Sequence, residues 1–113
     1  MSSKKEELVG KYIADIKEKF GEEPDMTLLN KVTDGLGPAI YNVDASKVSG
    51  GDEKELETVK QNYLIKKLGL DDGPELMEAI KSVIAQYGKT NRNKHRAVIY
   101  YKLCKHFNKE SVY

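Results

Sequence analysis

Residues 89–109, KTNRNKHRAVIYYKLCKHFNK, form the most informative stretch of this sequence. The stretch contains both histidines, the only cysteine, two adjacent tyrosines and a dense set of positive charges. On a helical projection its apolar residues gather on one side and its lysines on the other. The apolar side consists of Tyr100, Leu103, Cys104 and Phe107. We therefore predict an amphipathic helix over residues 92–108, although Val98 falls near the basic side. The rest of the chain is expected to be organised around this helix.

Four further helices are predicted from apolar residues that recur every three or four positions. They are expected near residues 3–20, 25–36, 52–68 and 74–87. Asp25 can cap the start of the second of these helices, and a glycine follows each of the other three. A short additional helical turn is expected between Ala39 and Val48. We predict an all-α fold, a compact single-domain bundle of about five main helices that spans residues 1–113.

Length and composition fit one globular domain. The chain has 113 residues, of which 39% are hydrophobic and 33% charged, so it can bury a core without disulfides. No apolar run approaches the roughly 20 residues that span a bilayer, and the N-terminus has no apolar segment typical of a secretory signal. A single cysteine fits a reducing compartment. We expect a cytoplasmic protein, monomeric or weakly dimeric, with no membrane partner.

The charges are divided unevenly along the chain. Residues 1–88 carry 12 Lys and Arg against 17 Asp and Glu, whereas residues 89–113 carry seven basic residues against one acid, Glu110. Such a division indicates either a basic helix packed beside acidic ones or an electropositive face for an anionic partner. Charge complementarity within a domain is common, so we favour the first interpretation.

The cysteine and the histidines form no recognisable catalytic or metal-binding pattern. On one helix Cys104 lies about 160° from His106 and roughly 180° from His95, so neither ring can reach the thiol. The two histidines share a stripe, but the helical rise between them is ~16 Å, too far for one metal ion. We predict no catalytic residue, no metal ligand and no cofactor, and we expect Cys104 to be buried as a small hydrophobe.

The best candidate for a binding surface is the polar and basic run at 89–96 together with the lysines that follow it. Basic side chains and asparagines in this run can contact phosphates or carboxylates. The candidate contacts with an anionic partner are Lys89, Arg92, Asn93, Lys94, Arg96, Lys102 and Lys105. A helix N-terminus already carries partial positive charge, so such a cluster is favourable only where carboxylates or phosphates answer it.

Three functions are consistent with these residues. The favoured one is a non-enzymatic protein-interaction module that uses the basic C-terminal face. The alternative is nucleic-acid binding through the same helix, with Tyr100 and Tyr101 available to stack on bases. The third is a small enzyme whose Asp, Glu and His residues are brought together by folding. Its general-base version requires His95 or His106 to lie within about 6 Å of a carboxylate.

Two spaced motifs give the chain a resemblance to a known family. VSGGD at 48–52 is followed by NYLIKKLGL at 62–70. Near the end, Arg92, Lys94, Arg96, Tyr100, Tyr101 and Leu103 form a second set. With these motifs residues 43–113 resemble a bacterial family of small helical proteins known as domain of unknown function 2853, and the N-terminal helix resembles it more loosely. The resemblance implies a compact all-α domain of bacterial origin. It implies no activity and no catalytic residues.

Overall fold

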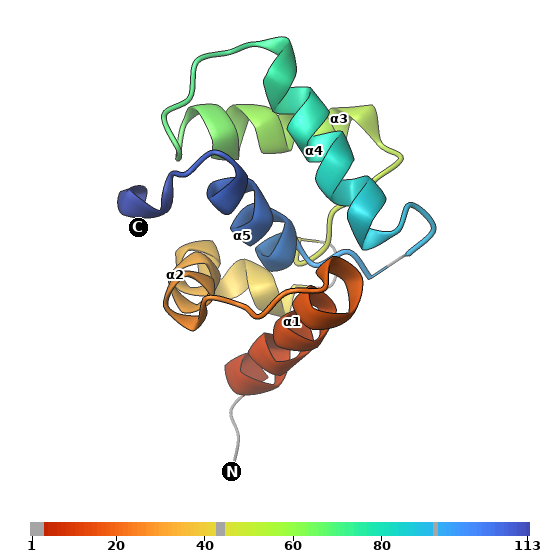
Figure 1. The fold of residues 1–113 in the computed structure, drawn as a ribbon, viewed down its shortest axis with the longest axis vertical. Helices are drawn as coiled ribbons and strands as arrows, with labels where there is room; N and C mark the ends of the chain where they lie inside the picture. Colours follow the sequence, from red (N-terminus) through yellow and green to blue (C-terminus); the bar gives the residue numbers. More distant parts are fainter. Residues whose placement is uncertain (1–3, 43–44, 92) are drawn as a thin grey trace.

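Helix α5, Arg96–His106, lies at the centre of the molecule and packs against α1, α2 and α4. In Figure 1, α1 and α2 lie on one side of it and α3 and α4 on the other. This computed structural model describes residues 4–42, 45–91 and 93–113. The other elements in chain order are α1 Lys4–Phe20, α2 Met26–Leu36, η1 Gly37–Tyr41, α3 Glu53–Val59, η2 Lys60–Ile65, α4 Pro74–Tyr87 and η3 Glu110–Val112.

Helix α5 is buried almost all round, which differs from the amphipathic helix predicted. Seven of its eleven residues are buried, including Val98, which the projection places near the basic side. A helix packed by neighbours on several sides needs apolar residues on more than one face. The imperfect apolar face in the sequence is therefore the sign of a central helix.

The start of α5 also differs from the prediction, because the helix begins at Arg96 and not near residue 92. His95, directly before it, is extended, and the backbone of Lys94 and His95 pairs with the loop that precedes α3. Lys47 and His95 form an isolated antiparallel bridge, with Val48 N donating to Lys94 O at 2.9 Å and Arg96 N to Ser46 O at 2.8 Å. Backbone groups bonded across this bridge are not available for an additional helical turn.

Where one continuous α-helix is predicted over residues 52–68, the structure has α3 followed by a stretch of π-helix, η2. Leu68 N bonds to Tyr63 O at 2.9 Å and Lys66 N to Gln61 O at 3.2 Å, each spanning five residues. The wider turn buries the sequence neighbours Tyr63 and Leu64 together. The Tyr63 ring stacks on Tyr100 at 3.8 Å, which fastens this turn to α5.

Helix α2 and the short helix η1 begin where the sequence supplies a capping or turn residue, and the buried apolar residues form one core. The Asp25 carboxylate caps α2 by accepting from Leu28 N at 3.2 Å, and the predicted short helical turn is η1, which begins at Gly37. The Cα radius of gyration is 13.1 Å, as expected for one domain of this length. The prediction of an all-α single domain is confirmed. Within the described residues no helix is long and apolar enough to span a membrane.

Candidate functional site

A pocket of about 440 Å³ lies between α1, η1 and the bridged segments that precede α3 and α5. Its wall contains cationic, polar and apolar side chains. The lining residues are Lys4, Leu8, Lys11, Ala14, Asp15, Ile40, Tyr41, Ser46, Lys47, Asn93 and His95. A volume of this size suits a small organic molecule, since ligand pockets span about 300–1,000 Å³.

Helix α1 supplies one wall of the pocket through a repeating stripe. Lys4, Leu8, Lys11 and Asp15 recur every three or four residues and so share one face of the helix. The adjacent face carries Tyr12 and Ile16, both fully buried. Packing of that apolar face fixes the rotation of α1, which in turn directs the charged stripe into the pocket.

His95 forms part of the pocket floor, at the N-cap position of α5. Its ring packs edge-on against Tyr12 with 5.2 Å between the centroids, and the residue is 9% exposed. Its Nε2 lies 3.9 Å from the Asp15 carboxylate. Among the described residues, neither its Nδ1 nor the Tyr12 hydroxyl has a hydrogen-bond partner, although both atoms are buried. Buried polar atoms normally find partners, so both of these orphan atoms are unusual; of the two residues, His95 lines the pocket and Tyr12 lies behind it in the core.

Tyr87 connects Asp15 to the backbone of His95. Its hydroxyl donates to the Asp15 carboxylate and accepts a hydrogen bond of 3.2 Å from His95 N. Burial and the Asp15 carboxylate raise the pKa of Tyr87, so this phenol stays protonated as a donor. Burial and the nearby Tyr41 raise the pKa of Tyr12 to about 12. Asp15, Tyr87 and His95 therefore form a polar cluster in which tyrosine fixes the position of the carboxylate.

Three lysines make the pocket electropositive. Lys4, Lys11 and Lys47 line it, and none of them forms an ion pair with a described residue. Among the described residues of the lining, Asp15 is the one carboxylate. Burial lowers the pKa of His95, and Lys47 and Lys11 lower it further while Asp15 opposes the shift. The charges of Lys47 and Lys11 therefore act on the His95 ring in the pocket floor.

The stability of the protein is expected to fall in mild acid because of His95. Its pKa in the folded protein is below the usual 6.5, so between these values the unfolded chain binds more protons. The free energy of unfolding should then decrease as the pH falls below about 6.5 and through the folded-state pKa. Urea denaturation at about pH 7.5 and about pH 5 measures this loss. The variant His95→Gln should lose less stability between the two pH values than the wild type, while His106→Gln, at an exposed position, should retain the full loss. Equal losses in all three proteins would contradict this role of His95.

Two of the predicted anionic-partner contacts are used inside the fold. The Arg96 guanidinium donates to Ala45 O at 2.7 Å, to Lys47 O at 3.3 Å and to the Glu55 carboxylate. Burial alone would lower the pKa of Arg96, but Tyr100 and Glu55 outweigh it and raise the pKa. Lys102 Nζ lies 2.8 Å from Glu22 Oε1. Both pairs match the interpretation of a basic helix packed beside acidic segments.

Lys94 is also directed inward. The residue is 4% exposed, and its ammonium donates to Lys89 O at 3.0 Å and to Asn91 O. Burial lowers the pKa of Lys94. Through these two carbonyls the side chain closes the turn between α4 and α5, which leaves it little surface for a partner.

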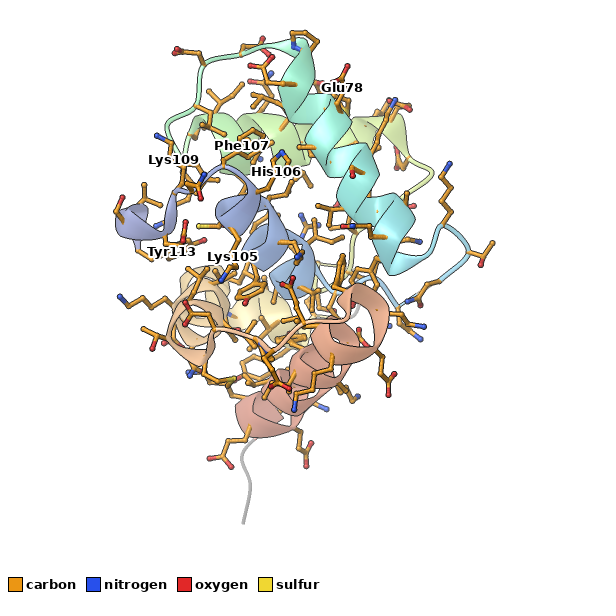
Figure 2. The ribbon with its side chains drawn as sticks, in the orientation of Figure 1. Glu78, Lys105, His106, Phe107, Lys109 and Tyr113 are labelled. Atoms are coloured by element: carbon orange, nitrogen blue, oxygen red, sulfur yellow. The ribbon has the colours of Figure 1, made fainter. Side chains whose placement is uncertain are left out.

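The other predicted contacts are spread over different faces. Asn93 lines the pocket described above, and Lys89 lines a separate groove between α3 and α4. Lys105 lies with His106, Phe107 and Lys109 around the far end of α5, as Figure 2 shows. Arg92 lies outside the described residues. The proposed contact of these side chains with an anionic partner stays a prediction.

The groove between α3 and α4 has a volume of about 570 Å³ and an apolar floor that includes Leu56 and Ile84. On its rim Lys81 Nζ lies 3.5 Å from Glu53 Oε1. Its rim contains Glu53, Glu78, Lys81 and Lys89, so acids and bases are equal in number. Its described lining residues therefore carry no excess charge, in contrast to those of the pocket at α1.

Cys104 and His106 are placed as the sequence indicates. Cys104 is fully buried, and burial raises the pKa of its thiol. His106 is exposed at the end of α5. His95 meets the 6 Å requirement for a general base through its 3.9 Å contact with Asp15. In the described part of the chain no three His, Cys, Asp or Glu residues are grouped to hold a metal ion.

Sequence reasoning missed most of this site, namely Asp15, Tyr87, Tyr12, Lys11, Lys47 and Tyr41. One signal was available, because the stripe of Lys4, Lys11 and Asp15 borders the apolar face of the first helix. However, an aspartate near lysines is common on the exposed face of a helix, so this stripe alone does not indicate a site. Only the fold brings Asp15 next to Tyr87, 72 residues later.

Comparison with known proteins relates the chain to a family without an assigned activity. The sequence profile of that family, described as "Protein of unknown function (DUF2853)", matches residues 11–111. No curated protein shows significant similarity to the chain. The resemblance drawn from the two motifs is thereby confirmed. The matched range includes every pocket residue except Lys4 and Leu8.

Proposed function

This chain belongs to the DUF2853 family of proteins of unknown function. From the lining of the pocket between α1 and the start of α5, we propose that it binds a small organic anion there. One observation supports this function above all. His95 lies in the floor with a buried, unpartnered nitrogen, and three lysines without ion-pair partners among the described residues line the same pocket. A ligand with an anionic group for the lysines and a polar group for the His95 nitrogen would interact with both.

The charge of the wall favours an anion over a cation or a neutral molecule. Lys4, Lys11 and Lys47 outnumber Asp15, whose carboxylate already accepts a hydrogen bond from Tyr87. Lysines gathered around a partly enclosed space raise the local concentration of anions. Phosphate and carboxylate groups are therefore the chemical classes that fit the rim.

The floor supplies orientation and not charge. Neutral imidazole has one N–H donor and one acceptor nitrogen. The Nε2 of His95 faces Asp15, which favours a proton on Nε2 and leaves Nδ1 as an acceptor. A hydroxyl or amine of the ligand can donate to such an acceptor after a small movement of the wall. This pairing would also satisfy one of the two orphan atoms.

The functions predicted from the basic helix have less support from the geometry. Arg96 and Lys102 are already paired with Glu55 and Glu22, and Lys94 is bonded to backbone carbonyls. A protein or nucleic acid that used these groups would first have to break the internal contacts. The enzyme alternative shares the Asp15–His95 pair with the proposed site, so ligand binding is the first step of either.

Calorimetric titration with adenosine 5′-monophosphate and with adenosine tests this function. The two probes differ by one phosphate group. We expect the phosphorylated probe to bind at least about tenfold more tightly, because its charge interacts with the lysines at the rim. Its affinity should fall as salt is added, since salt screens exposed charges.

Two results would contradict anion binding. One is equal affinity for the two probes, which would show that the phosphate makes no contact. The other is the absence of measurable heat with either adenosine 5′-monophosphate or ribose 5-phosphate at millimolar concentration, combined with a folded protein by circular dichroism.

A further inference from the structure

We infer that the ligand carries a flat aromatic ring as well as its anionic group, and that the ring stacks on Tyr41. This inference rests on the proposed anion binding at the same pocket and names the class of molecule that fits it. The relevant features are the exposure of Tyr41 and the apolar and polar side chains that line the same pocket.

Tyr41 ends the short helix η1 at the edge of the pocket. It is 51% exposed, the most exposed of the three large apolar side chains that the described residues leave open to solvent. Pro38 stands at the start of η1 and restricts the backbone there. The ring is therefore held at the rim by a short, constrained element, while half of its surface lacks a protein neighbour. An aromatic face of this kind is suited to stacking.

The pocket that Tyr41 lines also contains apolar side chains. Leu8 and Ala14 from α1 and Ile40 from η1 line the same space, and Leu8 and Ile40 are themselves buried. The aliphatic wall can cover the edge of a ring whose face lies on Tyr41. The lysines line the same pocket, so a molecule with a flat apolar ring and an anionic group can contact both kinds of side chain.

Tyr41 and His95 line the same pocket. Tyr41 lies close enough to the buried phenol of Tyr12 to raise its pKa, after the larger effect of burial. Tyr12 packs in turn against the His95 ring. A ring stacked on Tyr41 lies in the pocket that Lys47, Asn93 and His95 also line, so polar substituents on its edge meet these groups. Nitrogen heterocycles carry such substituents, and a nucleoside monophosphate combines them with an anionic group.

The test compares adenosine 5′-monophosphate with ribose 5-phosphate, which keeps the phosphate and the sugar but lacks the ring. Wild-type protein should bind the ring-bearing probe about tenfold more tightly, in line with the contribution of one base–aromatic stack. The variant Tyr41→Leu should lose that preference and leave the affinity for ribose 5-phosphate unchanged. Tyr41→Phe keeps the ring and should keep the preference. Since Tyr41 is half exposed, both variants are expected to fold.

The outcomes separate this inference from the function on which it rests. Equal binding of the two phosphates by the wild type, or a preference that survives in Tyr41→Leu, would overturn ring stacking while anion binding stands. Failure of both phosphates to bind would overturn anion binding itself. A preference lost in Tyr41→Leu and kept in Tyr41→Phe would establish the stack.

Discussion

Replacing Arg96 with alanine is expected to lower the free energy of unfolding by about 2–3 kcal/mol, below the roughly 3–5 kcal/mol of a fully buried ion pair because Arg96 and Glu55 are partly buried. The guanidinium joins three segments at once. It donates to the carbonyls of Ala45 and Lys47 and to the Glu55 carboxylate, and its Nη1 donates to Tyr100 Oη at 3.1 Å. Removal leaves Glu55 without its cation and releases the loop that precedes α3. Urea denaturation at neutral pH measures the loss.

The matched control is Arg96→Lys, which keeps the charge but not the planar group of donors. Lysine cannot bond two carbonyls and a carboxylate in this arrangement, so we expect an intermediate loss. Lys102→Ala removes a second charged pair from the same helix, and a smaller loss is expected because Glu22 is more exposed than Glu55. A loss below about 1 kcal/mol for Arg96→Ala would be that of a surface pair and would contradict this structural role.

The double charge reversal Lys11→Glu with Lys47→Glu is expected to weaken binding of adenosine 5′-monophosphate at least about 100-fold. At an effective dielectric of about 20, a lysine roughly 8 Å from an anion contributes about 2 kcal/mol, and reversal turns that attraction into repulsion. Salt reduces the effect, so a 100-fold loss is a low figure for two reversals. Calorimetric titration at low ionic strength measures the change.

A control variant with the same change in net charge distinguishes the effect of the pocket lysines from the effect of the net charge of the protein. Lys31→Glu with Lys66→Glu reverses two exposed lysines on α2 and on the segment that follows η2. This variant should retain nearly the affinity of the wild type, because neither position lines the pocket. Equal losses in the two double variants would mean that net charge, and not the pocket, governs anion binding.

The architecture could be predicted largely from local patterns. Apolar spacing along α1 and the Asp25 cap determine helices whatever the partner elements are. The central position of α5 could not be derived in this way, although Val98 on its basic side was a sign of it. Arg96 was a candidate contact with a partner, and its internal partner Glu55 could not be identified because it lies 41 residues earlier. Charge counting along one helix does not reveal such partners.

The candidate site depends even more on long-range contacts. Asp15 and His95 are an ordinary helix acid and a residue before a helix when the sequence is read locally. They form a site because the Tyr87 hydroxyl hydrogen-bonds to the Asp15 carboxylate and to the backbone N–H of His95. The bridge between Lys47 and His95 also brings a lysine to the pocket. A single sequence contains these residues but not their proximity. The π-helical turn η2 is similar, since it is stabilised by the stack of Tyr63 on Tyr100.

Amide chemical-shift mapping of the wild-type protein with adenosine 5′-monophosphate tests anion binding at this pocket most directly. Saturable shifts at Lys11, Asp15, Lys47 and Asn93 are predicted, with the His95 ring signals moving as the phosphate enters. Shifts confined to Lys105–Lys109 would place the anion at the far end of α5. That result, or no shifts at low salt, would contradict a binding pocket between α1 and the start of α5.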